Sequence, residues 1–183
     1  AENEIEFVLE REERAGRLQQ LRDSGELPTR VTHNDTKLNN VLFDKATDKG
    51  LCVIDLDTAM AGSMLYDFGD TLRSGATTAA EDETDLDEVF VDVKMFEGFA
   101  RGFIKGLENS LNEDELKALP MGAVILTFET GMRFLTDYIN GDVYFRIHRE
   151  HHNLDRCRSQ FKLVKEITQK EDELKQIIKN ILA

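Results

Sequence analysis

Hydrophobic positions recur every three or four residues over several long stretches of the chain, the spacing of amphipathic helices. Such a stretch near the amino terminus stops at Asp23–Gly25, and the helical period returns from Tyr66 onward. Asn112 and Glu115 have the spacing of a capping box, and Gly141 interrupts the pattern. The pattern predicts helices over residues 5–21, 85–108, 116–138 and 154–181.

Three shorter runs have the composition of β-strands, at residues 30–32, 41–44 and 51–54. Residues 45–50 separate the last two runs and are rich in Asp, Lys and Gly, which favours a turn. The sequence therefore predicts a β-hairpin with a polar loop in front of it. The expected fold class is α+β, mainly helical, with the hairpin carrying the functional loops.

Composition places limits on this picture. A chain of 183 residues is expected to form one domain, and its net charge of −13 argues against nucleic acid as a partner. The longest apolar run, Ala123–Leu126, is far too short to span a membrane. Two cysteines, Cys52 and Cys157, suggest reduced thiols rather than a disulfide framework. We therefore expect a cytoplasmic protein with neither membrane nor nucleic acid among its partners.

Two clusters of titratable residues are expected to be structural. Residues 81–88 contain six acids and no base, which favours a solvated loop and first helical turn over a cation site. His148, His151 and His152 have the spacing of one helix face, but no Cys or acid completes an obvious zinc site. These histidines are expected at the surface.

The polar segment Val31–Asp44 lies between β-prone runs, where a loop is held by rigid strands. Its His33, Asp35 and Asn40 match the catalytic-loop spacing of kinases, His-x-Asp, four residues, then Asn. In that loop the Asp accepts the proton of the substrate hydroxyl and the Asn holds Mg²⁺. Asp55 follows twenty residues after Asp35, at the end of a strand expected to be buried, where the second metal ligand of a kinase belongs.

Phosphoryl transfer explains why these residue types occur together. The transferring phosphate spreads negative charge over its oxygens, and Mg²⁺ prefers hard oxygen ligands such as those of Asn40 and Asp55. Asp35 stays free of metal to orient the acceptor hydroxyl and take its proton. Lys37 is placed to contact the phosphate as a point charge. His33, although part of the catalytic loop, is expected to brace it through backbone hydrogen bonds.

Five segments share a pattern with one known group of enzymes. They are HNDTKLNNVLF from His33, VIDLDT from Val53, YDFGD from Tyr66, GMRFLTDYINGDVYF from Gly131 and NLDRCR from Asn153. With them the chain resembles the aminoglycoside phosphotransferase and choline kinase superfamily, most closely the N-acetylhexosamine 1-kinases. The resemblance is good over residues 28–75 and fair over residues 131–167.

The resemblance implies a protein-kinase-like fold in which residues 1–183 are a single large, carboxy-terminal lobe. It implies transfer of the γ-phosphate of ATP, with Mg²⁺, to the anomeric hydroxyl of N-acetylglucosamine or N-acetylgalactosamine. Asp35 would then be the base, and Asn40 and Asp55 the metal ligands. The implied sugar contacts are Asp57, Thr58, Arg133 and Tyr144.

One part of a kinase is not found in the sequence. A small lobe with a phosphate-covering loop and a strand Lys paired with a helix Glu is needed to hold ATP, and the residues before His33 do not supply it. A chain that opens on Ala1 inside a predicted helix suggests a fragment. We expect residues 1–183 to fold but to be inactive alone. Residues 59–62 read Ala-Met-Ala-Gly where the family has Val-Met-Pro-Gly, which affects the expected shape of the sugar pocket.

Other functions remain open at this point. The acceptor of such a kinase could be an aminoglycoside, choline or homoserine instead of a sugar. Asp55 and Asp57 also resemble the Asp-x-Asp motif of haloacid-dehalogenase-like phosphatases, in which the first Asp is a nucleophile, although Ala59 stands where that motif expects Thr. A non-catalytic interaction domain with kinase-like loops is a third alternative, against which the joint presence of Asp35, Asn40 and Asp55 argues.

Overall fold

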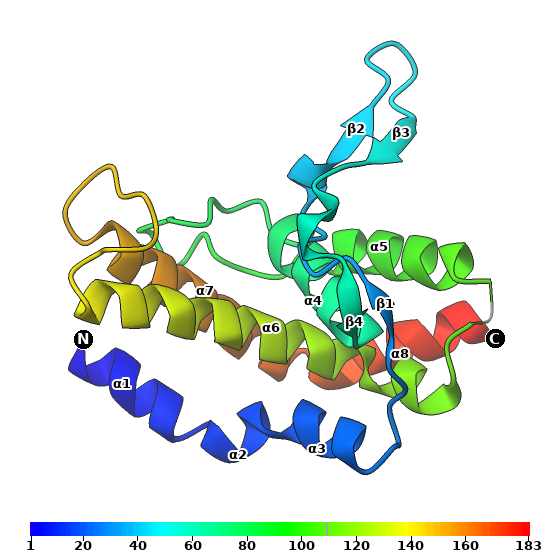
Figure 1. Cartoon of the computed structure of the whole chain (residues 1–183), viewed down its shortest axis with the longest axis horizontal. Coiled ribbons are helices and arrows are strands. Elements are labelled where there is room, and N and C mark those ends of the chain that lie inside the picture. The colour runs from blue at the N-terminus through cyan, green and yellow to red at the C-terminus, as the bar shows by residue number, and fades with distance from the viewer. Residues whose placement is uncertain (109) are drawn as a thin grey trace.

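The computed structural model describes residues 1–108 and 110–183, and helices dominate it (Figure 1). The helices are α1 (Glu2–Leu9), α2 (Glu12–Ala15), α3 (Arg17–Asp23), α4 (Met64–Gly75), α5 (Val93–Gly106), α6 (Glu113–Ile139), α7 (His152–Gln169) and α8 (Glu171–Leu182). The strands are β1 (Arg30–Thr32), β2 (Val41–Phe43), β3 (Gly50–Val53) and β4 (Met60–Gly62), and the 3₁₀ turns are η1 (Leu38–Asn40) and η2 (Leu56–Thr58). The expected mainly helical α+β architecture is confirmed.

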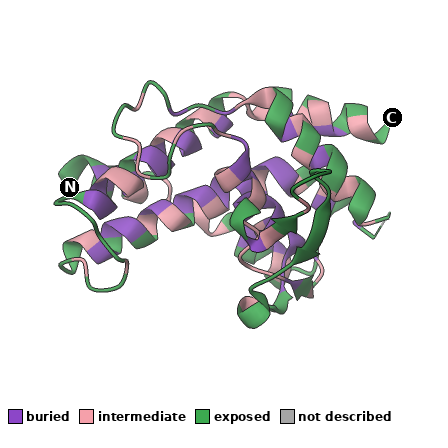
Figure 2. Ribbon diagram, turned by 90° about the horizontal axis from the view of Figure 1, so that it is seen from above, coloured by how far each residue is buried: buried purple, intermediate pink, exposed green. Residues whose placement is uncertain are grey.

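The long helix α6 forms the centre of the molecule and packs most extensively against α7 and α4. Its capping box is present as predicted: the Asn112 side chain accepts from the Glu115 N–H, and the Glu115 side chain accepts from the Asn112 N–H, each at 2.8 Å. Buried residues face one another along these helices (Figure 2), with Leu65, Phe68 and Leu119 fully enclosed. None of the helices in the described residues is both long and apolar enough to cross a membrane.

The backbones of α4 and α6 approach closely where two glycines meet. A Cβ atom on Gly69 would lie 2.5 Å from the Gly122 carbonyl oxygen, and one on Gly122 would lie 2.6 Å from the Leu65 carbonyl oxygen. No real side chain fits at such distances, so glycine at both positions lets the helices touch. This crossing fixes α4, which supports the functional loop described below.

The strands form two separate antiparallel pairs. Strands β2 and β3 make the predicted hairpin, which projects from the helical body (Figure 1). Strands β1 and β4 make a second pair, with Thr32 opposite Met60. Strand β4 was not predicted because Met-Ala-Gly contains no β-branched or aromatic residue. Because β4 pairs with β1, the chain between them forms a closed excursion that contains the β2–β3 hairpin.

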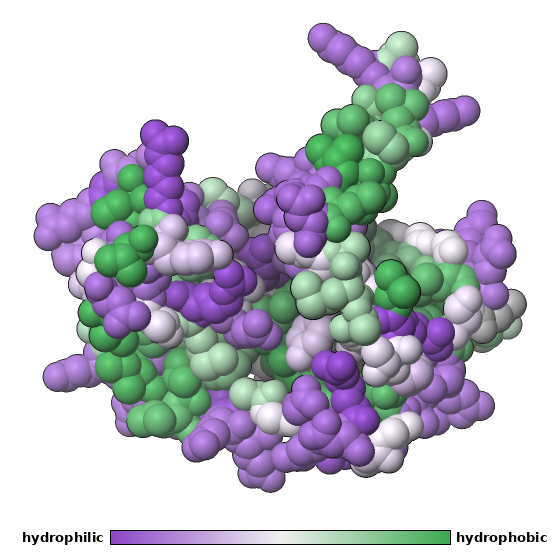
Figure 3. All heavy atoms as spheres, in the orientation of Figure 1, coloured by the Kyte–Doolittle hydropathy of each residue, from purple (hydrophilic) through white to green (hydrophobic). Residues whose placement is uncertain are grey.

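The hairpin corrects one expectation about burial. Strand β3 was expected to be buried, yet all four of its residues are exposed, with Leu51 63% and Val53 52% accessible. Leu42 and Phe43 on β2 are exposed as well. Apolar side chains thus run along the projecting hairpin (Figure 3). The apolar residues of the hairpin, which indicated burial, are exposed instead, because none of the described residues covers them.

Three helix boundaries also differ from the prediction. Residues 5–21 form three helices rather than one, with Gly16, a poor helix former, at the junction of α2 and α3. Helix α5 begins at Val93 rather than residue 85, because the Asp92 side chain caps it by accepting from two backbone N–H groups. The terminal helix breaks at Lys170, and α8 then packs against α5 and α6. Periodicity alone cannot place such breaks.

Candidate functional site

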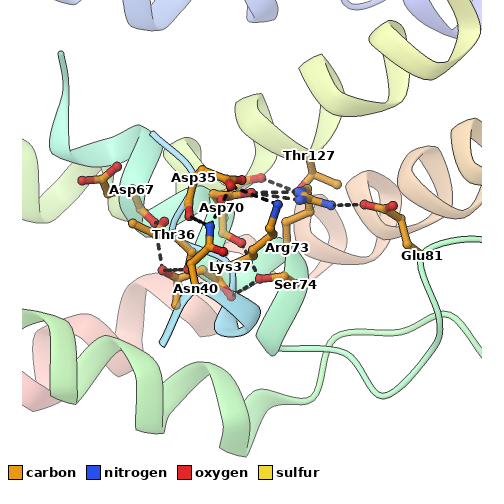
Figure 4. Close-up of polar contacts among 12 residues, drawn as sticks. Asp35, Thr36, Lys37, Asn40, Asp67, Asp70, Arg73, Ser74, Glu81 and Thr127 are labelled. Carbon is orange, nitrogen blue, oxygen red and sulfur yellow. Dashed lines mark hydrogen bonds and ion pairs between the residues drawn. The ribbon is translucent and has the colours of Figure 1, made fainter. Parts of the chain in front are cut away.

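The loop of residues 33–40 joins β1 to β2. The buried carboxylate of Asp67 on α4 holds the start of this loop. The backbone N–H groups of His33 and Asn34 donate to its two oxygens at 2.9 and 2.8 Å. The Thr36 hydroxyl donates to the Asp67 carbonyl oxygen at 2.5 Å (Figure 4). These bonds show that Asp67 braces the loop, and the α4–α6 crossing fixes the helix that carries Asp67.

A second set of bonds ties the loop to η2. Asn34 has a left-handed backbone with φ 61°, and its side-chain N–H donates to the Thr58 carbonyl oxygen at 3.0 Å. The Thr58 hydroxyl donates to the His33 carbonyl oxygen at 2.7 Å. Thr58, expected at the sugar, therefore has its proton committed to the loop backbone. Its neighbour Asp57 lies exposed on η2.

Both nitrogens of the His33 ring form hydrogen bonds with the backbone. Its Nδ1 accepts from the Asp35 N–H at 3.2 Å, and its Nε2 lies 3.0 Å from the Ile54 carbonyl oxygen. A carbonyl can only accept, so the Nε2 carries the proton and the ring is the neutral tautomer. This confirms the bracing role expected for His33, and it joins the loop to the residue that precedes Asp55.

The Asp35 carboxylate is partly exposed and receives two donors on one oxygen (Figure 4). The Asn40 side-chain N–H donates to Oδ2 at 2.7 Å, and the Lys37 ammonium lies 2.9 Å from the same atom. Burial by itself raises the pKa of Asp35, but the hydrogen bonds from Lys37 and Asn40 and the charge of Lys37 outweigh burial and lower it. Asp35 is therefore an ionised carboxylate at neutral pH, as a proton acceptor must be.

Asn40 is buried and oriented by the same contacts. Its side-chain nitrogen donates to both the backbone oxygen and the Oδ2 of Asp35, at 2.8 and 2.7 Å. Because both partners can only accept, the amide nitrogen faces Asp35 and the Oδ1 is directed elsewhere. The Ile54 N–H donates to the Asn40 carbonyl oxygen at 2.9 Å, which brings the next residue, Asp55, beside it.

Asp55 lies exposed at the end of the hairpin with a left-handed backbone, φ 63°. Asn40 and Asp55 together offer an amide oxygen and a carboxylate, which fit Mg²⁺, an ion that usually takes only one or two protein ligands and completes its shell with water and phosphate oxygens. Among the described residues there is no cluster of three or more His, Cys, Asp or Glu that would form a complete protein cage. The donor set thus suits Mg²⁺ brought in with a nucleotide rather than a structural metal.

Arg133 and Tyr144, 11 positions apart in the printed sequence, lie side by side in the structure. The Arg133 guanidinium on α6 lies 6.0 Å from the centre of the Tyr144 ring and 5.5 Å from that of Phe145. They line an open cavity of about 590 Å³, and Tyr144 is 74% exposed. The structure brings these two predicted residues together, at the carboxyl end of α6, without a direct contact to the Asp35 loop in the part of the chain it describes.

The family model named Phosphotransferase enzyme family (APH) matches residues 2–102, more than half of the chain. The chain belongs to this phosphotransferase family. The matched region contains Asp35, Lys37, Asn40 and Asp55 and ends before α6, so it supports phosphoryl-transfer chemistry and leaves the acceptor unspecified. Phosphotransferases of this family use ATP and typically Mg²⁺, which agrees with the donor set at Asn40 and Asp55.

An ionic network that the sequence did not predict lies beside the loop of this phosphotransferase. Arg73 on α4 pairs with Asp70 at 2.9 Å and with Glu81 at 2.7 Å (Figure 4). Arg73 and Glu81, together with Lys37, line a polar cavity of about 250 Å³ beside the loop. The i, i+3 spacing of Asp70 and Arg73 was the available signal, but the pairing with Glu81 depends on tertiary structure.

The expectations about two charged clusters in this phosphotransferase are confirmed in part. Residues 81–88 form a loop with most of its acids exposed, as expected, but it contains no helical turn, and Glu81 pairs with Arg73 while Asp82 accepts from the His152 ring at 2.9 Å. His148 and His151 are exposed as expected, whereas His152 is buried. A buried imidazole needs a partner for its N–H, and the acidic loop supplies one, an arrangement that helical spacing could not reveal.

Proposed function

We propose that this phosphotransferase chain carries the catalytic loop of a kinase that transfers the γ-phosphate of ATP to the anomeric hydroxyl of an N-acetylhexosamine, N-acetylglucosamine or N-acetylgalactosamine. The observation that carries the proposal is the geometry of Asp35: an ionised carboxylate in a kinase-type loop, held between Lys37 and Asn40, above a backbone fixed by Asp67. The family membership supports the reaction, and the sequence resemblance supports the acceptor.

Asp35 is the proposed general base. Lys37 and Asn40 both occupy its Oδ2, and among the described residues no hydrogen bond is formed by Oδ1. An acceptor hydroxyl can therefore donate to Oδ1 without displacing either neighbour. Its proton passes to Asp35 as the oxygen bonds to the γ-phosphorus and the bond from that phosphorus to the leaving ADP breaks, while the loop holds the carboxylate in place.

Lys37 has two tasks in this proposal. In the structure its ammonium pairs with Asp35, which keeps that carboxylate ionised. The side chain is 40% exposed, so it can also reach a phosphate oxygen of the transferring group and offset its charge. Both ring nitrogens of His33 are engaged with the backbone, so His33 serves as a brace.

Asn40 and Asp55 are the proposed ligands of Mg²⁺. When bound, the ion neutralises the charge that develops on the phosphate oxygens during transfer. Asn40 is suited to this because both of its amide hydrogens are held by Asp35, which leaves only its oxygen for a cation. The same two hydrogen bonds join Asn40, the proposed metal ligand, to Asp35, the proposed base, and so fix the position of one side chain relative to the other.

Arg133 and Tyr144 are the proposed sugar contacts, with Asp57 and Thr58 at the opposite side of the acceptor. An exposed aromatic ring offers an apolar face to a sugar ring, and a guanidinium donates to hydroxyl and amide oxygens. Thr58 has committed its proton to His33, so it can only accept from the sugar. The cavity that Arg133 and Tyr144 line is open and has mainly apolar walls, so a sugar can enter and leave it and lay one ring face against them.

The exposed hairpin supports a two-lobe enzyme in which residues 1–183 are the large lobe. Leu42, Phe43, Leu51 and Val53 present apolar surface that the described residues do not cover. Large exposed apolar patches mark contact surfaces. We propose that an ATP-binding lobe outside this chain packs over the hairpin and encloses the nucleotide between itself and Asp55.

An acceptor panel tests this function. The protein that joins residues 1–183 to its ATP-binding lobe is incubated with Mg-ATP and, separately, N-acetylglucosamine, N-acetylgalactosamine, choline, homoserine and an aminoglycoside, and ADP release is followed. We expect turnover with an N-acetylhexosamine well above the rate without acceptor. Turnover with choline, homoserine or the aminoglycoside alone would keep the kinase and overturn the acceptor.

A further inference from the structure

Asp137, on the last turns of α6, holds the loop that carries Tyr144. Its carboxylate is buried and accepts from three successive backbone N–H groups, those of Val143 at 3.0 Å, Tyr144 at 2.8 Å and Phe145 at 2.9 Å. The Asn153 side chain on α7 donates to it as well, at 2.8 Å. One side chain therefore fixes the backbone on both sides of Tyr144.

The loop is closed further by bonds around Asp142. The Asp142 N–H donates to the Asp137 carbonyl oxygen at 2.8 Å, and Asp142 has a left-handed backbone with φ 58°. Asn153 uses its side-chain nitrogen a second time, donating to the Asp142 carboxylate at 2.8 Å. Asn153 thus joins α7 to both acids, and the turn between Asp137 and Tyr144 has one conformation set by these contacts.

The loop held by Asp137 lies beside Arg133. Arg133 and Asp137 are four positions apart on α6 and lie one above the other on the same face. Asp137 holds the backbone of Tyr144, and the Tyr144 and Phe145 rings lie against the Arg133 guanidinium. All four residues line the open cavity of about 590 Å³. The position of one cavity wall therefore depends on Asp137.

The charge of Asp137 suits this task. Burial by itself raises the pKa of Asp137, but the hydrogen bonds from Phe145, Tyr144, Val143 and Asn153 outweigh it and lower the pKa. A neutral amide in its place has only one acceptor oxygen, whereas the loop uses both oxygens of the carboxylate.

We propose that Asp137 is a positioning residue for the acceptor: by fixing the backbone of residues 143–145 it presents Tyr144 beside Arg133 in the geometry that binds the N-acetylhexosamine. This inference rests on the proposed function for the identity of the ligand. It assigns to Asp137 and Asn153 a role that neither the catalytic-loop motif nor the family match gives them, since both residues lie outside the matched range.

The test compares Asp137→Asn with the control Asp92→Asn. Asp92 also accepts from two backbone N–H groups, but it does so at the start of α5 and does not line the cavity. Two readouts are made on the 183-residue chain: amide hydrogen exchange at residues 143–145, and the affinity for N-acetylglucosamine and N-acetylgalactosamine by calorimetry or ligand-observed NMR. We expect Asp137→Asn to speed exchange at these amides and to weaken sugar binding about tenfold, the worth of one or two lost hydrogen bonds.

A double-mutant cycle with Tyr144→Ala separates positioning from general loss of stability. If Asp137 acts through Tyr144, the effect of Asp137→Asn on affinity disappears when Tyr144 is already Ala. Tyr144 is mostly exposed, so Tyr144→Ala is expected to fold. Should Asp137→Asn fail to fold, Asn153→Ala, which removes one donor to the carboxylate, replaces it in the same cycle.

The outcomes distinguish this inference from the proposed function. Unchanged exchange at residues 143–145, or an equal loss of affinity in both Tyr144 backgrounds, overturns the positioning role while leaving the kinase intact. Absence of sugar binding by the wild-type chain contradicts the proposed acceptor, and the exchange data then decide by themselves whether Asp137 fixes the loop.

Discussion

The Asp35 carboxylate is partly exposed and ionised, and an ammonium and a side-chain amide hold it through one oxygen only. Such a group is prepared to accept a proton from a substrate on its other oxygen. Acids with a structural task, such as Asp67 and Asp137, are instead buried, and backbone N–H groups occupy both of their oxygens. This contrast is the residue-level argument for Asp35 as the base.

We predict that Asp35→Asn lowers kcat by about 10² to 10⁴ in the complete enzyme, the usual contribution of a positioned base, with little change in nucleotide affinity. Steady-state kinetics with the best acceptor of the panel measures the effect. Asp44→Asn is the control, because Asp44 accepts hydrogen bonds in the exposed hairpin turn, away from the loop. Near-normal turnover of Asp35→Asn would show that Asp35 is not the general base.

At the residue scale the sequence predicted the catalytic loop well and its supports only in part. His33, Asp35 and Asn40 belong to one short motif, and the structure confirms the bracing contacts expected of His33. It also shows bracing by Asp67. The roles of Asp35 and Asn40 stay predictions. Arg73 with Glu81, and Asp137 with Asn153, are 8 and 16 positions apart and join different parts of the chain, so helical spacing did not indicate them.

Among the elements, the crossing of α4 and α6 has the strictest packing requirement. We predict that Gly122→Ala destabilises the fold by about 1–3 kcal/mol, because the added methyl meets the Leu65 carbonyl oxygen and the helices must separate. Chemical denaturation measures the change. Gly102→Ala on α5 is the matched control: its Cβ meets nothing within 4 Å, and replacing a helical glycine stabilises by about 0.5–1 kcal/mol. Equal effects of the two variants would contradict the close crossing.

Helix α1 is joined to α7 by a half-buried ion pair, in which the Arg158 guanidinium lies 2.6 Å from the Glu4 carboxylate. Burial raises the pKa of Glu4, but the hydrogen bond from Arg158 and its charge outweigh burial and lower it. A lowered folded-state pKa gives stability that is present above the ordinary pKa of Glu and is lost as pH falls through the folded-state value.

We therefore predict that Glu4→Gln lowers the thermal stability at pH 7 and makes no difference once the pH lies below the folded-state pKa of Glu4. Melting curves of wild type and variant from pH 7 down to the acid-unfolding limit measure this. A difference in Tm that stays constant over the whole range would show that the ionised carboxylate contributes nothing.

The element boundaries show why periodicity gave the fold class but not its details. Amphipathic spacing located α5, α6, α7 and α8, because each buries an apolar face, and it indicated helical structure from Tyr66 without bounding α4. It could not locate the breaks at Gly16 and Lys170 or the late start of α5, which depend on caps and on tertiary packing. Strand β4 was missed because its residues, Met-Ala-Gly, have low β-propensity, whereas the equally short β1 contains Val and Thr.

On the scale of the whole molecule, the helical body has its own core and the hairpin projects from it with apolar residues exposed (Figure 3). The body therefore does not need the proposed ATP-binding lobe in order to fold, whereas the reaction needs a second wall to hold ATP and exclude water.

We predict that residues 1–183 alone unfold cooperatively on heating but release no ADP from Mg-ATP above background with either N-acetylhexosamine. Calorimetric melting and a coupled ADP assay on the same preparation check both statements. Robust turnover by the chain alone would contradict the two-lobe proposal and would require a nucleotide site within these residues.

The central claim is that phosphate passes from ATP to the anomeric oxygen of an N-acetylhexosamine above Asp35. Phosphorus NMR of the products formed by the protein joined to its ATP-binding lobe tests it most directly. The account predicts a sugar phosphate whose phosphorus couples to the anomeric proton, formed by the wild type and reduced at least a hundredfold in rate by Asp35→Asn. ADP released without a phosphorylated sugar, or phosphate found on another hydroxyl, would contradict it.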